Sequence, residues 1–107
     1  EGEGPVIIFS AVSDKKYEQM IEYLCRNMNA STYIVTEIED KRRVPAEELE
    51  RLFKKYTRKK VYRAGSLKEA LEKAESERVD DGDIFCLGSL YLAGMVKKLL
   101  AGGGYHA

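Results

Sequence analysis

The polar residues with the types and spacing for chemistry follow short apolar segments. Ser13-Asp14-Lys15-Lys16 follows the first of these segments. There, Asp14 could accept hydrogen bonds from a ligand hydroxyl while Lys15 faces a phosphate. The ordinary alternative is that Ser13 or Asp14 caps a helix and that the lysines are solvated. Periodicity alone favours the cap, and both interpretations stay open at this point.

A second candidate follows the last apolar segment, where Gly88-Ser89 precedes a helical pattern. Ser89 and nearby N–H groups would lie at the positive end of that helix, which suits a carboxylate, although Ser89 could equally be a plain N-cap. Arg42 and Arg43 lie in a charged loop, where a guanidinium beside a strand end could hold a carboxylate through two parallel hydrogen bonds. Paired loop arginines are more often solvated, as we expect for the other charges of this loop, and the sequence leaves open which arginine faces a site.

No complete catalytic set accompanies these candidates. The sequence has neither G-x-x-x-x-G-K-[ST] nor G-x-G-x-x-G, the two common phosphate-binding patterns. The single histidine, His106, lies beyond three glycines, and Cys25 and Cys86 lack metal-ligand spacing. We therefore predict no catalytic residue and no metal ligand in this chain, and no ATP hydrolysis by the chain alone.

Alternating patterns predict the elements that position these residues. Continuous apolar or β-branched runs indicate buried strands, and a more polar run indicates a strand near an edge. The predicted strands are the buried Val6–Phe9 and Ile84–Leu87, with Thr32–Thr36 and the polar Lys60–Arg63 between them. Apolar residues at helical spacing predict helices that begin near Asp14, after Pro45 and after a capping box formed by Ser66 and Glu69, with a closing helix lined by Leu92, Val96 and Leu99.

Short connections and right-handed crossovers between these elements predict a Rossmann-like three-layer α/β sandwich. Its sheet should be mostly parallel, with at least four strands and helices on both faces. Residues 1–107 should form a single domain, because a second core would leave too little apolar surface for each. Every strand-to-helix loop then emerges at the carboxyl edge of the sheet, where ligands bind in such folds. The candidate residues should meet at this edge.

Composition excludes several classes of partner. The 18 basic and 18 acidic residues cancel, so no overall field attracts nucleic acid or an anionic membrane. No apolar run approaches the roughly 20 residues that span a bilayer, and two cysteines are too few for a disulfide framework. We expect a cytoplasmic protein without nucleic-acid or membrane partners.

Three segments resemble a known family. Gly88-Ser89-Leu90-Tyr91-Leu92-Ala93-Gly94 resembles the G-S-L-Y-L-x-G signature near the C-terminus of folylpolyglutamate synthases, which belong to the Mur ligase superfamily. Phe9 through Tyr17 resembles the family's F-[GS]-A-x-x-D-K-D-Y segment, with Lys16 in place of the second aspartate. Arg42 through Leu49 resembles its R-x-x-x-A-x-x-L stretch, and order and spacing agree over nearly the whole chain.

The resemblance implies an ATP-dependent ligase that adds L-glutamate to folate or folylpolyglutamate through an acyl phosphate, with this chain as its C-terminal, glutamate-binding domain. Asp14 and Lys15 would face the nucleotide. Ser89 and Leu90, assisted by Arg42 or its neighbour, would hold a carboxylate of the incoming glutamate. ATP and Mg²⁺ would bind to the complete enzyme and not to this domain alone. The partner would be an N-terminal P-loop domain of the same parent chain, which this sequence does not contain.

Other functions stay open from the residues alone. The chain could be a free-standing α/β module that binds a small ligand, a purely structural interaction domain, or the C-terminal domain of a peptidoglycan Mur ligase. The Gly88-Ser89-Leu90-Tyr91 segment favours the folate branch over the last of these. A receiver-like domain is disfavoured, because the third strand ends in Arg63-Ala64-Gly65 and offers no acceptor aspartate. The sequence does not indicate whether the parent also has dihydrofolate synthase activity.

Overall fold

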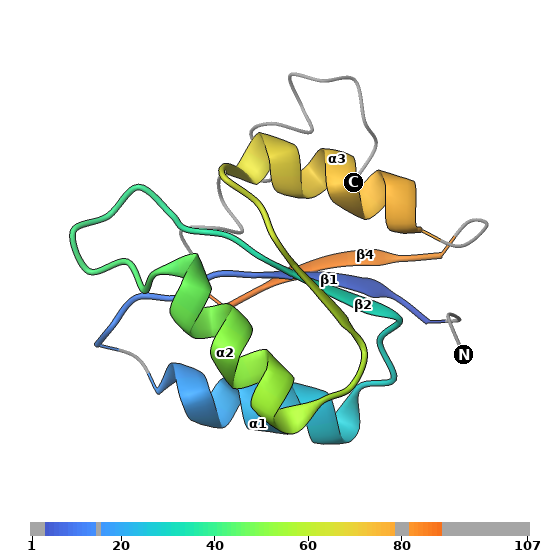
Figure 1. Ribbon diagram of the computed structural model, residues 1–107, viewed down its shortest axis with the longest axis horizontal. Coiled ribbons are helices and arrows are strands. Elements are labelled where there is room, and N and C mark those ends of the chain that lie inside the picture. The colour runs from blue at the N-terminus through green and yellow to red at the C-terminus, as the bar shows by residue number, and fades with distance from the viewer. Residues whose placement is uncertain (1–3, 15, 79–81, 89–107) are drawn as a thin grey trace.

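The protein is described by a computed structural model over residues 4–14, 16–78 and 82–88 (Figure 1). Within these ranges, four strands alternate with three helices along the chain. The strands are β1 (Val6–Phe9), β2 (Thr32–Val35), β3 (Lys60–Arg63) and β4 (Ile84–Leu87). The helices are α1 (Tyr17–Asn27), α2 (Ala46–Tyr56) and α3 (Leu67–Glu77). The predicted closing helix lined by Leu92, Val96 and Leu99 lies outside the described residues.

The four strands form one parallel sheet in the order β3-β2-β1-β4. β1 lies inside the sheet, with β2 on one side and β4 on the other, and all of its residues are buried. β3 lies at an edge and exposes Lys60 and Arg63, as its polar sequence predicted. The predicted α/β fold, with a parallel sheet of at least four strands, is confirmed.

The position of β4 corrects one prediction. Its apolar run predicted a strand buried on both faces, but none of its four residues is fully buried, and Phe85 is 40% exposed. In the described ranges β4 pairs with β1 alone, so only one of its long sides has a neighbouring strand. An apolar run reveals the composition of a strand but not its place in the sheet, which is why the sequence misplaced β4.

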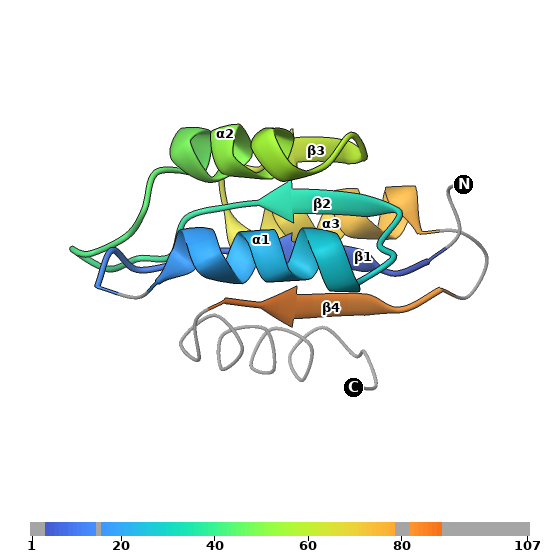
Figure 2. The same cartoon turned by 90° about the horizontal axis from the view of Figure 1, so that it is seen from below.

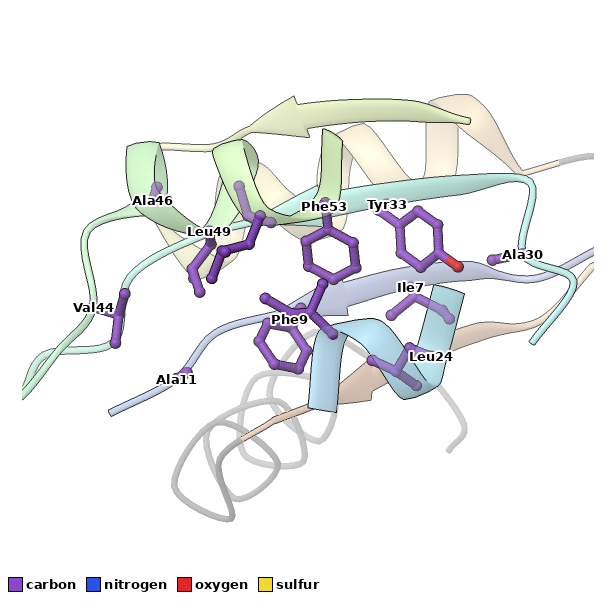
Figure 3. Close-up of a cluster of buried hydrophobic side chains, with 13 residues drawn as sticks. Ile7, Phe9, Ala11, Leu24, Ala30, Tyr33, Val44, Ala46, Leu49 and Phe53 are labelled. Carbon is purple, nitrogen blue, oxygen red and sulfur yellow. The ribbon is translucent and has the colours of Figure 1, made fainter. Parts of the chain in front are cut away.

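Helices cover both faces of the sheet, with α1 and α2 on one face and α3 on the other (Figures 1 and 2). The ring of Phe53 from α2 meets Phe9 of β1 edge-on, at a centroid distance of 5.4 Å, and lies 4.6 Å from the ring of Tyr33 on β2 (Figure 3). Successive residues of a strand point to opposite faces, so Ile7 and Phe9 join this core while Ile8 joins the core under α3. The three predicted layers follow from this alternation.

Local signals set the ends of the helices. The Ser66 hydroxyl accepts a hydrogen bond from the Glu69 backbone N–H at 3.1 Å, and the Glu69 carboxylate accepts one from the Gly65 N–H at 3.1 Å. The predicted capping box is therefore present, with its return bond one residue earlier than usual. Helix α2 begins directly after Pro45. No helix in the described ranges is long and apolar enough to cross a membrane.

The chain turns sharply after β4 at Gly88, where φ is +112°. A Cβ at this position would collide with the backbone carbonyl oxygen of Ser10, and L side chains rarely adopt this φ. We predict that Gly88→Ala lowers the free energy of unfolding by about 1–3 kcal/mol, as measured by urea denaturation. Gly65→Ala is the matched control, since its Cβ would meet only the flexible Glu69 carboxylate, at 3.1 Å. Equal losses from the two substitutions would contradict this account of Gly88.

Candidate functional site

Two loops meet at the carboxyl edge of the sheet, one following β1 and the other joining β2 to α2. The backbone N–H of Ser13 donates to the carbonyl of Arg42 at 2.7 Å, and that of Val44 donates to the carbonyl of Ala11 at 3.0 Å. Between these bonds, Val12 and Arg43 form an isolated antiparallel bridge. Because these contacts are made by backbone groups, they do not depend on which side chains the two loops carry.

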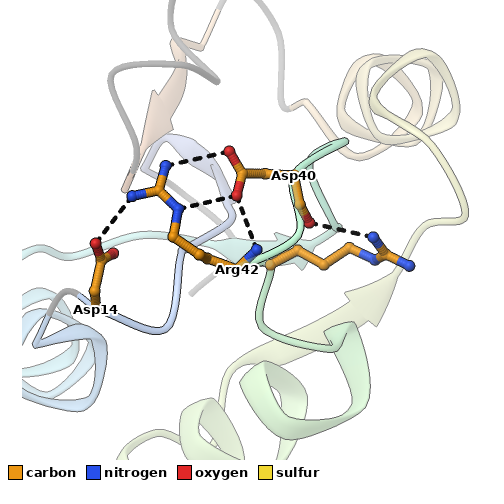
Figure 4. Close-up of polar contacts among 4 residues, drawn as sticks. Asp14, Asp40 and Arg42 are labelled. Carbon is orange, nitrogen blue, oxygen red and sulfur yellow. Dashed lines mark hydrogen bonds and ion pairs between the residues drawn. The ribbon is translucent and has the colours of Figure 1, made fainter.

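This junction brings together Asp14 and Arg42, which the family resemblance assigned to different ligands (Figure 4). Nη1 of Arg42 donates to Oδ2 of Asp14 at 2.9 Å. On the other side of the guanidinium, Nε and Nη2 donate to Oδ1 and Oδ2 of Asp40 at 3.0 and 3.2 Å. The backbone N–H of Arg42 also donates to Oδ1 of Asp40, at 2.8 Å. We refer to Asp14, Asp40 and Arg42 as the loop ion cluster.

The loop ion cluster is open to solvent. The side chains of Arg42 and Asp14 are 56% and 52% exposed, and that of Asp40 is 21% exposed. Exposed ion pairs typically contribute about 0–1 kcal/mol to stability, so the cluster orients its side chains more than it stabilises the fold. Hydrogen bonds from the Arg42 side chain and backbone lower the pKa of the Asp40 carboxyl, and the two carboxylates, Asp40 foremost, raise the pKa of Arg42.

The start of α1 excludes one of the two interpretations of Asp14, the helix cap. The N-cap residue of this helix is Lys16, and no side chain caps it. The prediction that Ser13 or Asp14 caps α1 is therefore wrong, because the helix starts too late in the chain for either residue to occupy the cap. Instead, the carboxylate of Asp14 points across to the neighbouring loop (Figure 4).

Glu37 has a structural role that the sequence did not reveal. One carboxylate oxygen accepts a hydrogen bond from the Ala46 N–H at the start of α2, at 2.9 Å, and the other accepts one from Nε of Arg43 at 3.2 Å. Glu37 thus caps α2 in place of Pro45, which has no capping side chain. Glu37 is exposed, as expected for the other charges of this loop, but its carboxylate is also held by these two hydrogen bonds. No local spacing rule links a glutamate to an N–H nine residues later.

The other predicted site residues, Lys15, Ser89 and Leu90, lie outside the described residues. Gly88, which directly precedes Ser89, does lie at the carboxyl edge, where the Ser10 N–H at the end of β1 donates to the carbonyl of Leu87 at 3.5 Å. On the other side, the Thr36 hydroxyl donates to the carbonyl of Ala64 at 3.1 Å. The carboxyl ends of the four parallel strands therefore lie along one edge, in the order β3-β2-β1-β4.

The carboxyl edge also carries an open hollow of about 490 Å³. Its lining comes from the loop between β2 and α2 and from the turn after β3, and comprises Glu37, Ile38, Glu39, Asp40, Lys41, Arg43 and Gly65. In the part of the chain that the structure describes, no three His, Cys, Asp or Glu side chains are arranged to hold a metal ion. The described part of this edge presents mainly charged and hydrogen-bonding side chains.

The sequence matches no protein-family model and no curated protein. Solved structures do match. Folylpolyglutamate synthase from Mycobacterium tuberculosis, complexed with ADP and AMPPCP, superposes on 90% of this chain with a TM-score of 0.79 and 22% identity. The bifunctional folylpolyglutamate synthase/dihydrofolate synthase from Yersinia pestis, complexed with AMPPNP and Mn ion, superposes on 92% with a TM-score of 0.74 and 13% identity. Folylpolyglutamate synthase from Thermotoga maritima superposes on 94% with a TM-score of 0.65 and 24% identity.

The chain has the fold of part of a folylpolyglutamate synthase. It spans 22% to 23% of the length of the three folylpolyglutamate synthases compared above. The resemblance drawn from the sequence motifs is therefore confirmed at the level of the fold. At 13% to 24% identity, the fold is what these folylpolyglutamate synthases share with the chain.

The lowered pKa of Asp40 gives a test of the loop ion cluster. Because a carboxyl with a depressed folded-state pKa stabilises the fold above its unfolded pKa, the contribution of Asp40 should be present at neutral pH. This stabilising contribution should be lost as the pH falls through the lowered pKa that Asp40 has in the folded protein. We predict that the pKa of the Asp40 carboxyl lies below the usual range of an aspartate in the wild type and moves upward in Arg42→Gln, as measured by NMR.

Arg43→Gln is the control for this titration. It removes the same charge from the next residue, whose side chain contacts the Glu37 carboxylate and only the backbone carbonyl of Asp40. The Asp40 carboxyl should titrate as in the wild type. An equal upward shift in both variants would mean that general loop charge, and not the contact with Arg42, sets the pKa of Asp40.

Proposed function

We propose that this chain is the C-terminal, glutamate-binding domain of an ATP-dependent ligase of the folylpolyglutamate synthase type. The observation that carries the proposal is the superposition of 90% of the chain on less than a quarter of a folylpolyglutamate synthase complexed with nucleotides. The motifs that follow β1 and β2 add support, since the loops that carry them are neighbours at the carboxyl edge. The parent enzyme would add L-glutamate to folate or folylpolyglutamate in the cytoplasm.

The proposed reaction divides the work between two domains. The N-terminal P-loop domain of the parent would bind ATP and Mg²⁺ and use ATP to activate a carboxylate of the folate substrate. This chain would close over that domain, contribute side chains to the nucleotide, and present the amine of the incoming glutamate. Closure is physically useful because it keeps water from an intermediate that hydrolyses and aligns the amine for attack.

The residues at the ends of β1 and β4 would take the two ligands. Asp14 would accept hydrogen bonds from the ribose of the nucleotide, and its carboxylate suits this role because it is half exposed and does not cap α1. Lys15 would face the phosphates. Ser89 and Leu90 would hold a carboxylate of the glutamate through a hydroxyl and a backbone N–H, and Arg42 would assist, as the resemblance implies.

The division of labour predicts that the 107-residue chain alone is inactive. Mixed with ATP, Mg²⁺, a folate and L-glutamate, it should form no ligated product, because it has neither of the common phosphate-binding patterns. The full-length ligase that contains it should form product, measured by chromatography of the glutamylated folates. Ligation by the chain alone would contradict the two-domain proposal, and a full-length protein without ATP-dependent glutamate ligation would overturn the function.

Ser89 tests the glutamate site. If Ser89 receives the carboxylate, Ser89→Asp brings like charges together in a closed site, and the KM for glutamate should rise steeply. Loss of one hydrogen bond to a charged group, in Ser89→Ala, should lower kcat/KM for glutamate by about ten- to a hundredfold. The KM for ATP should change little in both variants. Both KM values are measured by steady-state kinetics of the full-length ligase, with glutamate or ATP as the varied substrate.

If Ser89 is only an N-cap, its substitution should leave the KM for glutamate unchanged. Ser89→Asp would then be tolerated, since an acidic cap suits the helix dipole, and Ser89→Gly would cost only a few tenths of a kcal/mol. Thermal melts of the same variants separate a change in stability from a change in binding. Unchanged glutamate kinetics in Ser89→Asp would remove this residue from the proposed site.

A further inference from the structure

The loop ion cluster joins the residue proposed for the nucleotide to the arginine proposed for glutamate. Arg42 donates from Nη1 to Asp14 across the junction of the two loops, at 2.9 Å. A ligand that binds to either side chain therefore also acts on the other side chain through this contact. The pair is better understood as one unit.

Charge argues against a third carboxylate at this guanidinium. Arg42 already lies between the carboxylates of Asp14 and Asp40, so the loop ion cluster carries one positive and two negative groups. A glutamate carboxylate that approached Arg42 would meet repulsion from both aspartates, and like charges at close range are unfavourable. The cluster therefore suits a neutral hydrogen-bond donor, such as a hydroxyl, better than an anion.

Counting hydrogen bonds leads to the same conclusion. A carboxylate accepts through both oxygens, and Arg42 contacts only Oδ2 of Asp14. Asp14 can thus keep Arg42 on Oδ2 while Oδ1 accepts from a ligand hydroxyl. Arg42, by contrast, donates from both Nε and Nη2 to Asp40. The side of the guanidinium that could bind another carboxylate in a bidentate manner is therefore already occupied.

We propose that Arg42 is a positioning residue for Asp14, and that Asp40 fixes Arg42 so that Asp14 presents Oδ1 to the ribose hydroxyls of the nucleotide. This inference rests on the proposed ligase function and changes the ligand that Arg42 serves. Asp40 fixes the guanidinium by a fork of two hydrogen bonds, and a third bond holds the Arg42 backbone. The backbone bonds between the loops set the distance to Asp14.

The test compares the two KM values of the full-length ligase. Arg42→Gln should raise the KM for ATP about three- to tenfold, in the range of coupling between contacting residues, and leave the KM for glutamate within about twofold. Arg42→Lys keeps the charge but cannot form the fork to Asp40 while reaching Asp14. Its KM for ATP should therefore rise nearly as much. Arg51→Gln is the matched control, because it removes an exposed arginine of α2 that pairs with Glu48, and it should leave both KM values close to those of the wild type.

A double variant separates positioning from an independent contact. Asp14→Asn should raise the KM for ATP on its own, and adding Arg42→Gln to it should cause little further rise, because Arg42 acts through Asp14. The inference is overturned if Arg42→Gln raises the KM for glutamate and spares that for ATP, if Arg42→Lys restores wild-type kinetics, or if the two changes multiply. These outcomes all require an active wild-type ligase, so they are distinct from failure of the proposed function, which would leave no ATP-dependent ligation to measure.

Discussion

The structure depends on the burial of β1. No side chain of this strand is exposed, and its backbone lies away from water, so its N–H and C=O groups need partners on both sides. β2 and β4 supply them in parallel register. Parallel neighbours cannot be joined by tight turns, so the chain must return along a face of the sheet each time. The helical layers and the common carboxyl edge both follow from this requirement.

The candidate site is a consequence of strand order. Because β1 and β2 are neighbours, the loops that leave them emerge side by side, and they are close enough for backbone hydrogen bonds. Those bonds place Asp14 opposite Arg42, although 28 residues separate them in sequence. The exposed ion pairs of the loop ion cluster are too weak to hold two loops together. The backbone hydrogen bonds therefore determine how far apart Asp14 and Arg42 lie, and the two side chains pair at that distance.

Much of the fold could be predicted from the sequence, because its signals are local. The buried run of β1, the helical spacing in α2 and the capping box at Ser66 each lie within a few residues. The misplacement of β4, the cap that Glu37 provides to α2 and the partner of Asp14 depend on which strands are neighbours and on where side chains point across loops. Spacing along the chain carries no such information. The motifs therefore indicated the edge at which the candidate residues Asp14 and Arg42 lie, but not the contacts between them.

Exposure of the loop ion cluster gives a physical reason why a second domain would matter. In contact with water, charges at hydrogen-bond distance attract each other weakly, and salt screens them further. Asp14 and Arg42, each more than half exposed, would therefore hold a ligand poorly by themselves. If another domain covered the carboxyl edge and displaced water, the same hydrogen bonds would strengthen without any change in their geometry. Under the proposed function, domain closure would thus convert a weak, preformed arrangement of side chains into a binding site only when the nucleotide-bearing domain is in place.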